Sequence, residues 1–282
     1  MTEGRQPEPA VNSTPPRVVL IHHENDHIDG EGLASWLACT FDLVGPVVMR
    51  EHRSRKLARA KNEIRRSGFW HFLDVLAFRL YYRLFRARAD AASTAQEVAR
   101  LRACYPARLG HVPRVVAPSP NTPEVRRFLL DLRPDLMIAR CKFILKPEVF
   151  NIPAGGTFVL HPGICPEYRN AHGCFWALVN RDHERVGMTL LRMDEGVDTG
   201  PVFFHGGCEY DERGESHVII QYRVVTSNLE AIGSALLSVW KGERRPIPTE
   251  GRRSAMWGQP TLSAYARWKR RARTHRTRTD RA

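Results

Sequence analysis

The feature that most constrains the fold is a series of short apolar segments between residues 134 and 204, each ending in polar or turn-forming residues. The segment 157–160 ends at His161, and the last two segments flank an Asp-Thr-Gly turn at 198–200. Apolar, β-branched runs of this length predict buried strands. We predict strands at 135–139, 157–160, 188–192 and 202–205, the last two as an antiparallel pair.

The N-terminal part predicts a strand-helix-strand unit. Residues 17–22 form a β-branched apolar run, 30–38 carry apolar residues at helical spacing, and 41–49 are again apolar. Strands that alternate with helices predict a mainly parallel α/β sheet with helices on both faces. Further predicted elements are a strand at 114–117, a helix to about Leu132 that starts near Thr122-Pro123, a short helix at 147–150 and a single helix at 216–240.

The chain divides by composition. We predict a disordered, Pro-rich lead at 1–16, an α/β domain at 17–210 with a helical insertion at 53–103, a C-terminal helix within 211–250, and a basic tail at 251–282 that is extended or mobile. No apolar run approaches the length of a membrane span, and the polar start predicts no export signal. The six cysteines form no C-x-x-C pair, which favours reduced thiols and a cytoplasmic protein.

The net charge of +13 is concentrated in two segments. Residues 50–88 hold 12 basic and 3 acidic residues, and residues 251–282 hold 10 and 1. The tail from Trp268 is a candidate contact for nucleic acid or anionic membrane, although solvated disorder is the default for such a composition. The apolar stretch 69–85 predicts either a helix packed over the sheet or an interfacial helix that contacts a membrane or a partner.

Several motifs occur in a fixed order. The first is the segment Ile144-Leu145-Lys146-Pro147, whose Pro147 lies fourteen residues before His161. A Pro-rich loop with Tyr168-Arg169 follows, and the segment Asp194–Pro201 then reads DEGVDTGP. Over about seventy residues this order resembles the catalytic core of the folate-dependent formyltransferases, a family that includes glycinamide ribonucleotide and sugar N-formyltransferases. The resemblance implies a Rossmann-like formyltransferase fold. It also implies transfer of a formyl group from 10-formyltetrahydrofolate, as co-substrate, to an amine.

The resemblance implies catalytic roles for His161, as general acid/base and oxyanion partner, and for Asp198, as its electrostatic support. Formyl transfer passes through a tetrahedral intermediate that needs a hydrogen-bond donor at its oxygen and a group that moves protons. The family supplies an Asn amide two residues before the His, but Val159 stands there and donates nothing. Asn170 and His172 are the nearest candidates to replace that donor.

Other site residues follow from the same resemblance and from the sheet edge after the first strand. They are Phe143, Ile144, Leu145, Thr189 and Asp194 for the folate, and Arg169, His22 and His23 for the substrate. The polar run from His22 to Asp29 matches no metal-ligand spacing, so no metal is expected. The expected acceptor is a small-molecule amine such as an amino sugar or a biosynthetic intermediate. Initiator tRNA is not expected, because the β-barrel appendage of methionyl-tRNA formyltransferases is not found in the sequence.

Two alternatives remain open at the level of the sequence. Val159 is also compatible with hydrolysis of formyl-folate or an N-acyl substrate, in which His161 and Asp198 activate water. A catalytically silent basic adaptor that binds membrane or nucleic acid through the insertion and tail is the other alternative.

Overall fold

The computed structural model describes residues 14–50, 65 and 68–274. Most of the predicted lead, the start of the predicted insertion and the last eight residues of the predicted tail lie outside these ranges. No helix of the described residues has the length and apolar character needed to cross a membrane.

The centre of the described chain is a seven-stranded, mainly parallel sheet with the strand order β3-β2-β1-β4-β5-β7-β8. The first five strands in this order are parallel, and β7 and β8 are antiparallel to their neighbours. The strands are β1 (Arg17–His23), β2 (Asp42–Met49), β3 (Val115–Ala117), β4 (Leu136–Arg140), β5 (Gly156–His161), β7 (Gly187–Arg192) and β8 (Val202–Gly207). The strands predicted from the apolar runs are therefore confirmed.

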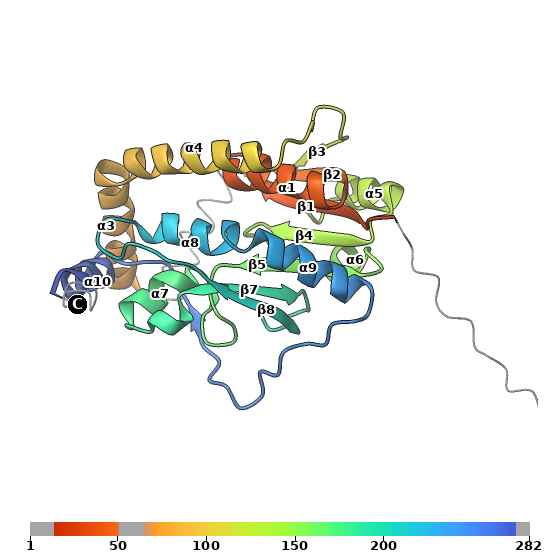
Figure 1. Cartoon of the computed structure of the whole chain (residues 1–282). Coiled ribbons are helices and arrows are strands. Elements are labelled where there is room, and N and C mark those ends of the chain that lie inside the picture. Colours follow the sequence, from red (N-terminus) through yellow and green to blue (C-terminus); the bar gives the residue numbers. More distant parts are fainter. Residues whose placement is uncertain (1–13, 51–64, 66–67, 275–282) are drawn as a thin grey trace, which may run out of the picture.

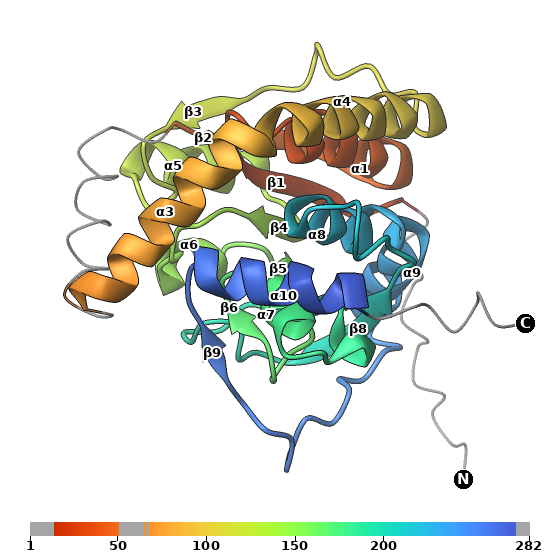
Figure 2. The same cartoon turned by 90° about the vertical axis from the view of Figure 1, so that its left-hand side faces the viewer.

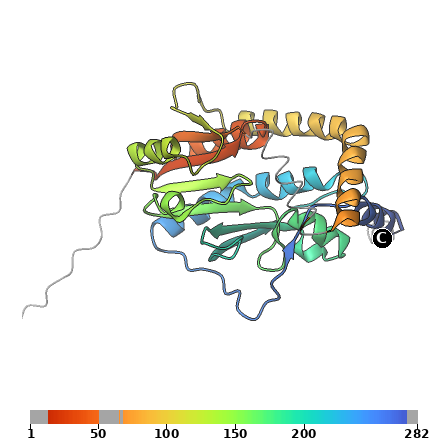
Figure 3. The same ribbon diagram turned by 180° about the vertical axis from the view of Figure 1, so that it is seen from behind.

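Helices cover both faces of the sheet (Figures 1 and 3). Side chains alternate along β1, so Val18 and Leu20 belong to one apolar core and Val19 and Ile21 to the other. The helices that contribute to the first core include α1 (Ala34–Thr40), α4 (Ala87–Cys104), α7 (Gly173–Val179), α8 (His217–Thr226) and α9 (Leu229–Trp240). The second core is closed by α5 (Pro123–Leu132) and α6 (Pro147–Phe150).

Local sequence explains where these helices begin. The Thr122 hydroxyl accepts a hydrogen bond from the Val125 backbone N–H, and Pro123 occupies the first turn of α5. This arrangement satisfies a backbone donor that the first turn leaves without a partner. The π-helix η1 (Ile28–Leu33) precedes α1, and the 3-10 helix η2 (His183–Arg185) follows α7.

The predicted single helix at 216–240 is two helices. The Asn228 side-chain amide donates hydrogen bonds to the Val224 and Gly207 carbonyls, at 2.8 and 2.9 Å. These bonds lie where α8 gives way to α9, and they tie the junction to the end of β8. A polar side chain that bonds to nearby backbone competes with the helical pattern, and apolar spacing carries no sign of it.

The prediction of an extended or mobile tail was wrong for residues 256–274. Met256–Trp257 form β9, which pairs in parallel with β6 (Arg169–Asn170) in a second small sheet, and Leu262–Thr274 form α10. Trp268 is completely buried, and its ring meets those of Phe175 and Tyr265 edge to face. The segment folds because a few aromatic residues anchor it, although it is basic and sparse in aliphatic residues.

The described part of the insertion consists of α3 (Phe69–Phe85) and α4. Helix α3 does not pack flat over the sheet. It contacts α10 and α4 and lies with α10 at one end of the molecule, on the side that faces the viewer in Figure 2. The Phe78 ring contacts those of Phe175, His217 and Tyr265, so only one side of α3 is buried.

The buried Trp268 generates a prediction about stability. Trp268→Ala should lower the free energy of unfolding by about 3–5 kcal/mol, because it leaves a cavity beneath α10. Urea unfolding followed by circular dichroism measures this change. The exposed neighbour Arg270 gives the matched control, with an expected change within about 0.5 kcal/mol for Arg270→Ala. Equal stabilities of the two variants would contradict the packing of α10.

Candidate active site

Three of the sequence-predicted site residues lie, together with Arg140, at the carboxyl ends of three adjacent parallel strands. His22 and His23 end β1, Arg140 ends β4, and His161 ends β5. From β1 the sheet extends through β2 and β3 on one side and through β4 and β5 on the other. The order in which the strands follow along the chain therefore switches sides between β1 and β4. Crevices outside the carboxyl ends of strands at such a switch point are the usual ligand sites of open α/β sheets.

His161 is held between two oxygen atoms. Its side chain is 5% exposed, its Nε2 lies 2.7 Å from the Tyr168 carbonyl oxygen, and its Nδ1 lies 3.5 Å from Asp198 Oδ2. A carbonyl accepts hydrogen bonds, so Nε2 carries the proton in this contact. The other ring nitrogen faces the Asp198 carboxylate.

Two glycines allow the loop after β5 to fold over His161. A Cβ atom on Gly163 would lie 2.7 Å from His161 Nε2 and 2.7 Å from the Tyr168 oxygen, and one on Gly173 would lie 2.6 Å from the Gly163 Cα. Any larger residue would push the Tyr168 carbonyl away from the imidazole. The loop also contains a cis peptide bond between Cys165 and Pro166.

Asp198 links the Asp-Thr-Gly turn to this loop. It adopts a left-handed conformation with φ 52°, and its Oδ2 accepts a hydrogen bond of 2.8 Å from the Asn170 backbone N–H. The same oxygen faces His161. One carboxylate therefore fixes the loop and the imidazole together.

The two candidate substitute donors differ in their availability. The Asn170 side-chain amide donates a hydrogen bond of 2.6 Å to the Trp257 carbonyl, so one of its two protons is used to hold β9. His172 Nδ1 is shielded from solvent and has no hydrogen-bond partner. Burial lowers the pKa of His172 to about 4, so the ring is neutral at pH 7. Of these two side chains, Asn170 is engaged with β9, and His172 has a buried ring nitrogen without a hydrogen bond.

A second buried imidazole lies beside His172. The rings of His172 and His217 are 5.6 Å apart, His217 is 2% exposed, and its Nδ1 also lacks a partner. Burial lowers the pKa of His217 well below its usual value. Gln221 Oε1, one turn further along α8, is likewise buried without a partner. Buried polar atoms normally have partners. Hydrogen bonding to the Gln221 and Gln259 side chains opposes the lowering of the His172 pKa by burial, so Gln221 and His172 belong to one buried polar cluster at the start of α7 and on α8.

Sequence reasoning did not find the ion pair that organises the β1–β4 edge. Arg140 Nε donates to Asp29 at 2.9 Å, and its Nη1 donates to the Leu160 carbonyl, next to His161. Asp29 is 2% exposed, and burial raises its pKa to about 7 although Arg140 opposes this shift. Tyr222 donates to Asp26, and Asp26 in turn accepts from the Asp29 backbone. The one signal of this network in the sequence was an arginine, Arg140, directly after the predicted strand 135–139.

The predicted folate-binding residues differ in exposure. The Ile144 side chain is 75% exposed, whereas Phe143 and Leu145 belong to the second core. Thr189 does not fit a ligand contact, because it is fully buried and its hydroxyl donates to the Gly163 carbonyl while it accepts from the Cys165 N–H. Thr189 thus braces the loop. Thr189 faces the interior from β7, which lies between β5 and β8, and this position explains why it does not contact a ligand as expected.

The remaining predicted residues are tied to nearby loops. Asp194 accepts hydrogen bonds from the Gly196 N–H and the Thr199 hydroxyl, and so closes the Asp-Thr-Gly turn. Arg169 Nη1 donates to the Val197 carbonyl, while its buried Nε has no partner. His22 is buried, with a pKa lowered by burial, and His23 Nε2 accepts from the Lys142 N–H. Among the described residues there is no group of three or more His, Cys, Asp or Glu side chains that could hold a metal ion.

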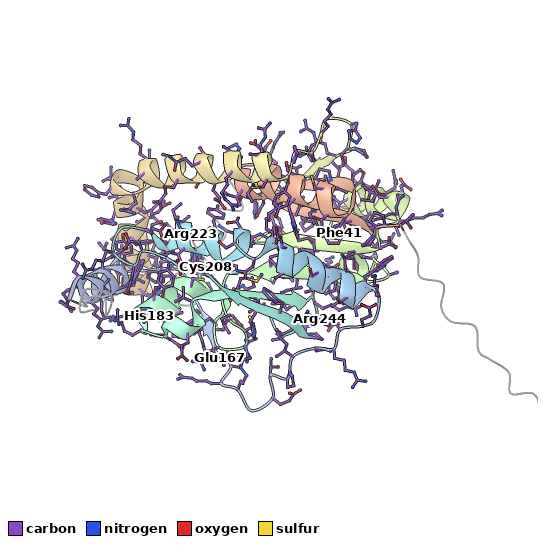
Figure 4. All side chains as sticks on the ribbon, in the orientation of Figure 1. Phe41, Glu167, His183, Cys208, Arg223 and Arg244 are labelled. Atoms are coloured by element: carbon purple, nitrogen blue, oxygen red, sulfur yellow. The ribbon has the colours of Figure 1, made fainter. Side chains whose placement is uncertain are left out.

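The C-terminal segment packs against the loop that contains Tyr168. Arg252 pairs with Glu167 through two hydrogen bonds of 2.9 and 2.6 Å, and Trp257 stacks between Tyr168 and Trp176 with ring centroids 5.6 and 5.1 Å away. Glu167 marks the position of this loop in Figure 4. The segment predicted as a tail therefore helps to set the position of the Tyr168 carbonyl that His161 contacts.

Comparisons with known proteins identify the family of this chain. Residues 86–236, more than half of the chain, match the sequence model of the family described as formyl transferase. Methionyl-tRNA formyltransferase from Pelotomaculum thermopropionicum is 30% identical over 136 residues, which cover 46% of this chain and 41% of that protein. The human mitochondrial 10-formyltetrahydrofolate dehydrogenase is 26% identical over 113 residues, 39% of this chain and 12% of that protein. The chain thus spans about two fifths or less of the length of these two relatives.

Solved structures share the fold. A sugar N-formyltransferase from Shewanella sp FDAARGOS_354 superposes with a TM-score of 0.51 at 14% identity, covering 93% of this chain and 89% of that one. Phosphoribosylglycinamide formyltransferase from Anaplasma phagocytophilum gives a TM-score of 0.51 at 11% identity, covering 88% and 100%. The Rossmann-like fold with a mainly parallel sheet is therefore confirmed, and this chain belongs to the formyl transferase family.

The glycine contact at His161 generates a prediction. Gly163→Ala should displace the Tyr168 carbonyl and lower the free energy of unfolding by about 1–3 kcal/mol, as overpacking does. Urea unfolding gives the stability, and the NMR signal of the hydrogen-bonded Nε2 proton of His161 reports the contact. Gly110→Ala is the control, because nothing lies within 4 Å of a Cβ at that position. An unchanged Nε2 proton signal in Gly163→Ala would contradict the described loop.

Proposed function

We propose that this chain transfers a formyl group from 10-formyltetrahydrofolate to the amine of a small molecule, with His161 as the proton-transferring group and Asp198 as its support. The observation that carries the proposal is the placement of His161 at the end of β5, between the Tyr168 carbonyl and Asp198. Membership of the formyl transferase family supports the class of reaction.

The residues at this edge have the features that a formyl-folate requires. Arg169 offers a buried Nε–H without a partner beside the Asp-Thr-Gly turn, and Ile144 offers an exposed apolar side chain. The folate would supply the formyl carbon that the amine attacks. Polar atoms that can orient a ligand, beside an apolar surface that can cover it, are typical of cofactor sites.

The chain's own groups account for proton transfer and charge. His161 Nδ1 would take the proton that the amine loses as it bonds to the formyl carbon, and Asp198, 3.5 Å away, would stabilise the resulting imidazolium. The imidazolium would then return this proton to the folate nitrogen as the bond between that nitrogen and the formyl carbon breaks, which releases tetrahydrofolate. Val159 lies on the same face of β5 as His161, two residues earlier, and donates no hydrogen bond. His172 is a neutral imidazole with an available nitrogen on the adjoining loop. We assign it the role of donor to the formyl oxygen.

The polar groups beyond His172 support a small polar acceptor. His217 Nδ1 is a buried hydrogen-bonding atom without a partner, the Gln221 side chain lies beside His172, and α10 contacts α7 at this end of the molecule. They suit hydroxyl groups, as on an amino sugar. Curated relatives include methionyl-tRNA formyltransferases, so the proposal that the acceptor is not initiator tRNA is tested by including that tRNA among the acceptors assayed.

Folate binding is the first test. Excess 5-formyltetrahydrofolate, a stable analogue of the donor, should raise the melting temperature by several degrees, since a ligand at a hundred times its Kd adds about 2.7 kcal/mol. Ile144→Asp should reduce the shift, whereas Leu130→Asp, on exposed α5 surface, should not. No shift at millimolar ligand would exclude the folate reaction and leave the adaptor alternative. A shift with formate release that no amine accelerates would establish the hydrolase alternative.

The donor role of His172 gives a second prediction, measured as tetrahydrofolate release with amino-sugar acceptors. His172→Ala should lower kcat about 10²–10³-fold, the usual effect of removing one oxyanion donor. Adding Val159→Asn to His172→Ala should restore much of the rate, because an amide then stands where the family's donor stands. Val159→Leu has a similar shape and no donor, so it should restore nothing. Wild-type rates in His172→Ala would overturn the assignment.

A further inference from the structure

Helix α3 carries two apolar faces, and only one of them is buried. Val75 and Phe78 are buried against the aromatic cluster around Tyr265. On the other side, an exposed stripe follows the helix at intervals of four, three, four and four residues. Its members are Phe69, Leu73, Leu76, Leu80 and Leu84, joined at one end by Trp70.

The stripe is unusually apolar for an exposed surface. Trp70 is 81% exposed and Leu80 57%, and all six residues lie on one continuous arc of the helix. Contiguous exposed apolar surface of this kind normally marks an interaction site, unlike single exposed apolar residues. A partner that binds here must therefore match both the apolar stripe and the charged side chains that lie beside it.

Those charges are positive. Arg79 and Arg83 are exposed residues of α3, and the adjacent α10 has five basic residues and no acidic one. Four of them are exposed arginines (Arg267, Arg270, Arg271 and Arg273). Lys269 is the exception, because its Nζ donates to the carbonyls of Glu212, Arg213 and Glu215. The acidic residue of α3, Asp74, accepts two hydrogen bonds from Ser263.

We propose that the outer faces of α3 and α10 form a docking surface for an anionic lipid bilayer. An apolar stripe with aromatic residues, set beside arginines, inserts into the interface between headgroups and acyl chains while the arginines contact acidic headgroups. Both helices lie on the side of the molecule seen in Figure 2. A second copy of the chain is the less favourable occupant, because two such surfaces would bring arginines against arginines.

The proposal is independent of the formyl transfer reaction, and its test uses the full chain and no folate. The protein is mixed with large vesicles of phosphatidylcholine alone, or of phosphatidylcholine with one quarter phosphatidylglycerol, and sedimented. It should bind the mixed vesicles, and its affinity for neutral vesicles should be lower by at least about tenfold. Absence of binding to both vesicles would overturn the proposal, and so would equal binding to both.

Matched variants distinguish insertion of the stripe from simple charge attraction. Leu80→Glu should weaken binding to mixed vesicles by about tenfold, whereas Leu130→Glu makes the same charge change on exposed α5 and should weaken it much less. Arg270→Glu with Arg273→Glu should also weaken binding by at least about tenfold. Arg126→Glu with Arg127→Glu, two exposed arginines of α5, is the corresponding control. Circular dichroism and melting temperature should be unchanged in all four variants, because every substituted side chain is exposed.

Each other outcome contradicts the proposal. Wild-type binding by Leu80→Glu would mean that the stripe does not insert. Equal loss in the α3 or α10 variants and in the α5 variants would mean that net charge alone drives binding. Dimerisation that Leu80→Glu abolishes, with no binding to vesicles, would assign the surface to a second copy.

Discussion

The hydrogen bond between His161 and the Tyr168 carbonyl sets the geometry of the whole site. The imidazole and the carbonyl are both buried, and a buried polar group without a partner is costly. The loop between them must therefore return to the end of β5, and it does so only because Gly163 and Gly173 have no side chains. Thr189 holds the loop from the sheet side, and β9 holds it from the other side. Removal of any one support shifts the carbonyl and, through it, the orientation of the ring.

Much of the sheet could be predicted from the sequence because its strands are short, apolar and separated by polar turns. His161 and Asp198 were predicted from motif spacing, and the structure brings them within 3.5 Å. They are distant in the sequence, but each comes at or after the end of a strand that the apolar pattern predicts.

The remaining features depend on contacts between distant segments. The spacing of apolar residues gave no warning that Asn228 divides the helix at 216–240, because the cause is an amide bonded to β8. The basic composition of residues 251–274 predicted an extended or mobile segment, yet its three aromatic residues Trp257, Tyr265 and Trp268 pack against the rest of the molecule and order it. Thr189 matched a family motif, but its hydroxyl serves the loop. Motif matching locates a residue in the fold without saying which neighbour uses its side chain.

The aromatic stack at the C-terminal segment makes the site loop visible to spectroscopy. Trp176 and Trp257 are stacked, with 24° between their ring planes and ring centroids 5.1 Å apart. Indoles this close couple their electronic transitions, so together they give a paired signal in circular dichroism that neither ring gives alone. One ring belongs to the helix that follows the loop and the other to β9. The paired circular-dichroism signal of these two indoles is therefore lost when the C-terminal strand separates from the loop that carries Tyr168.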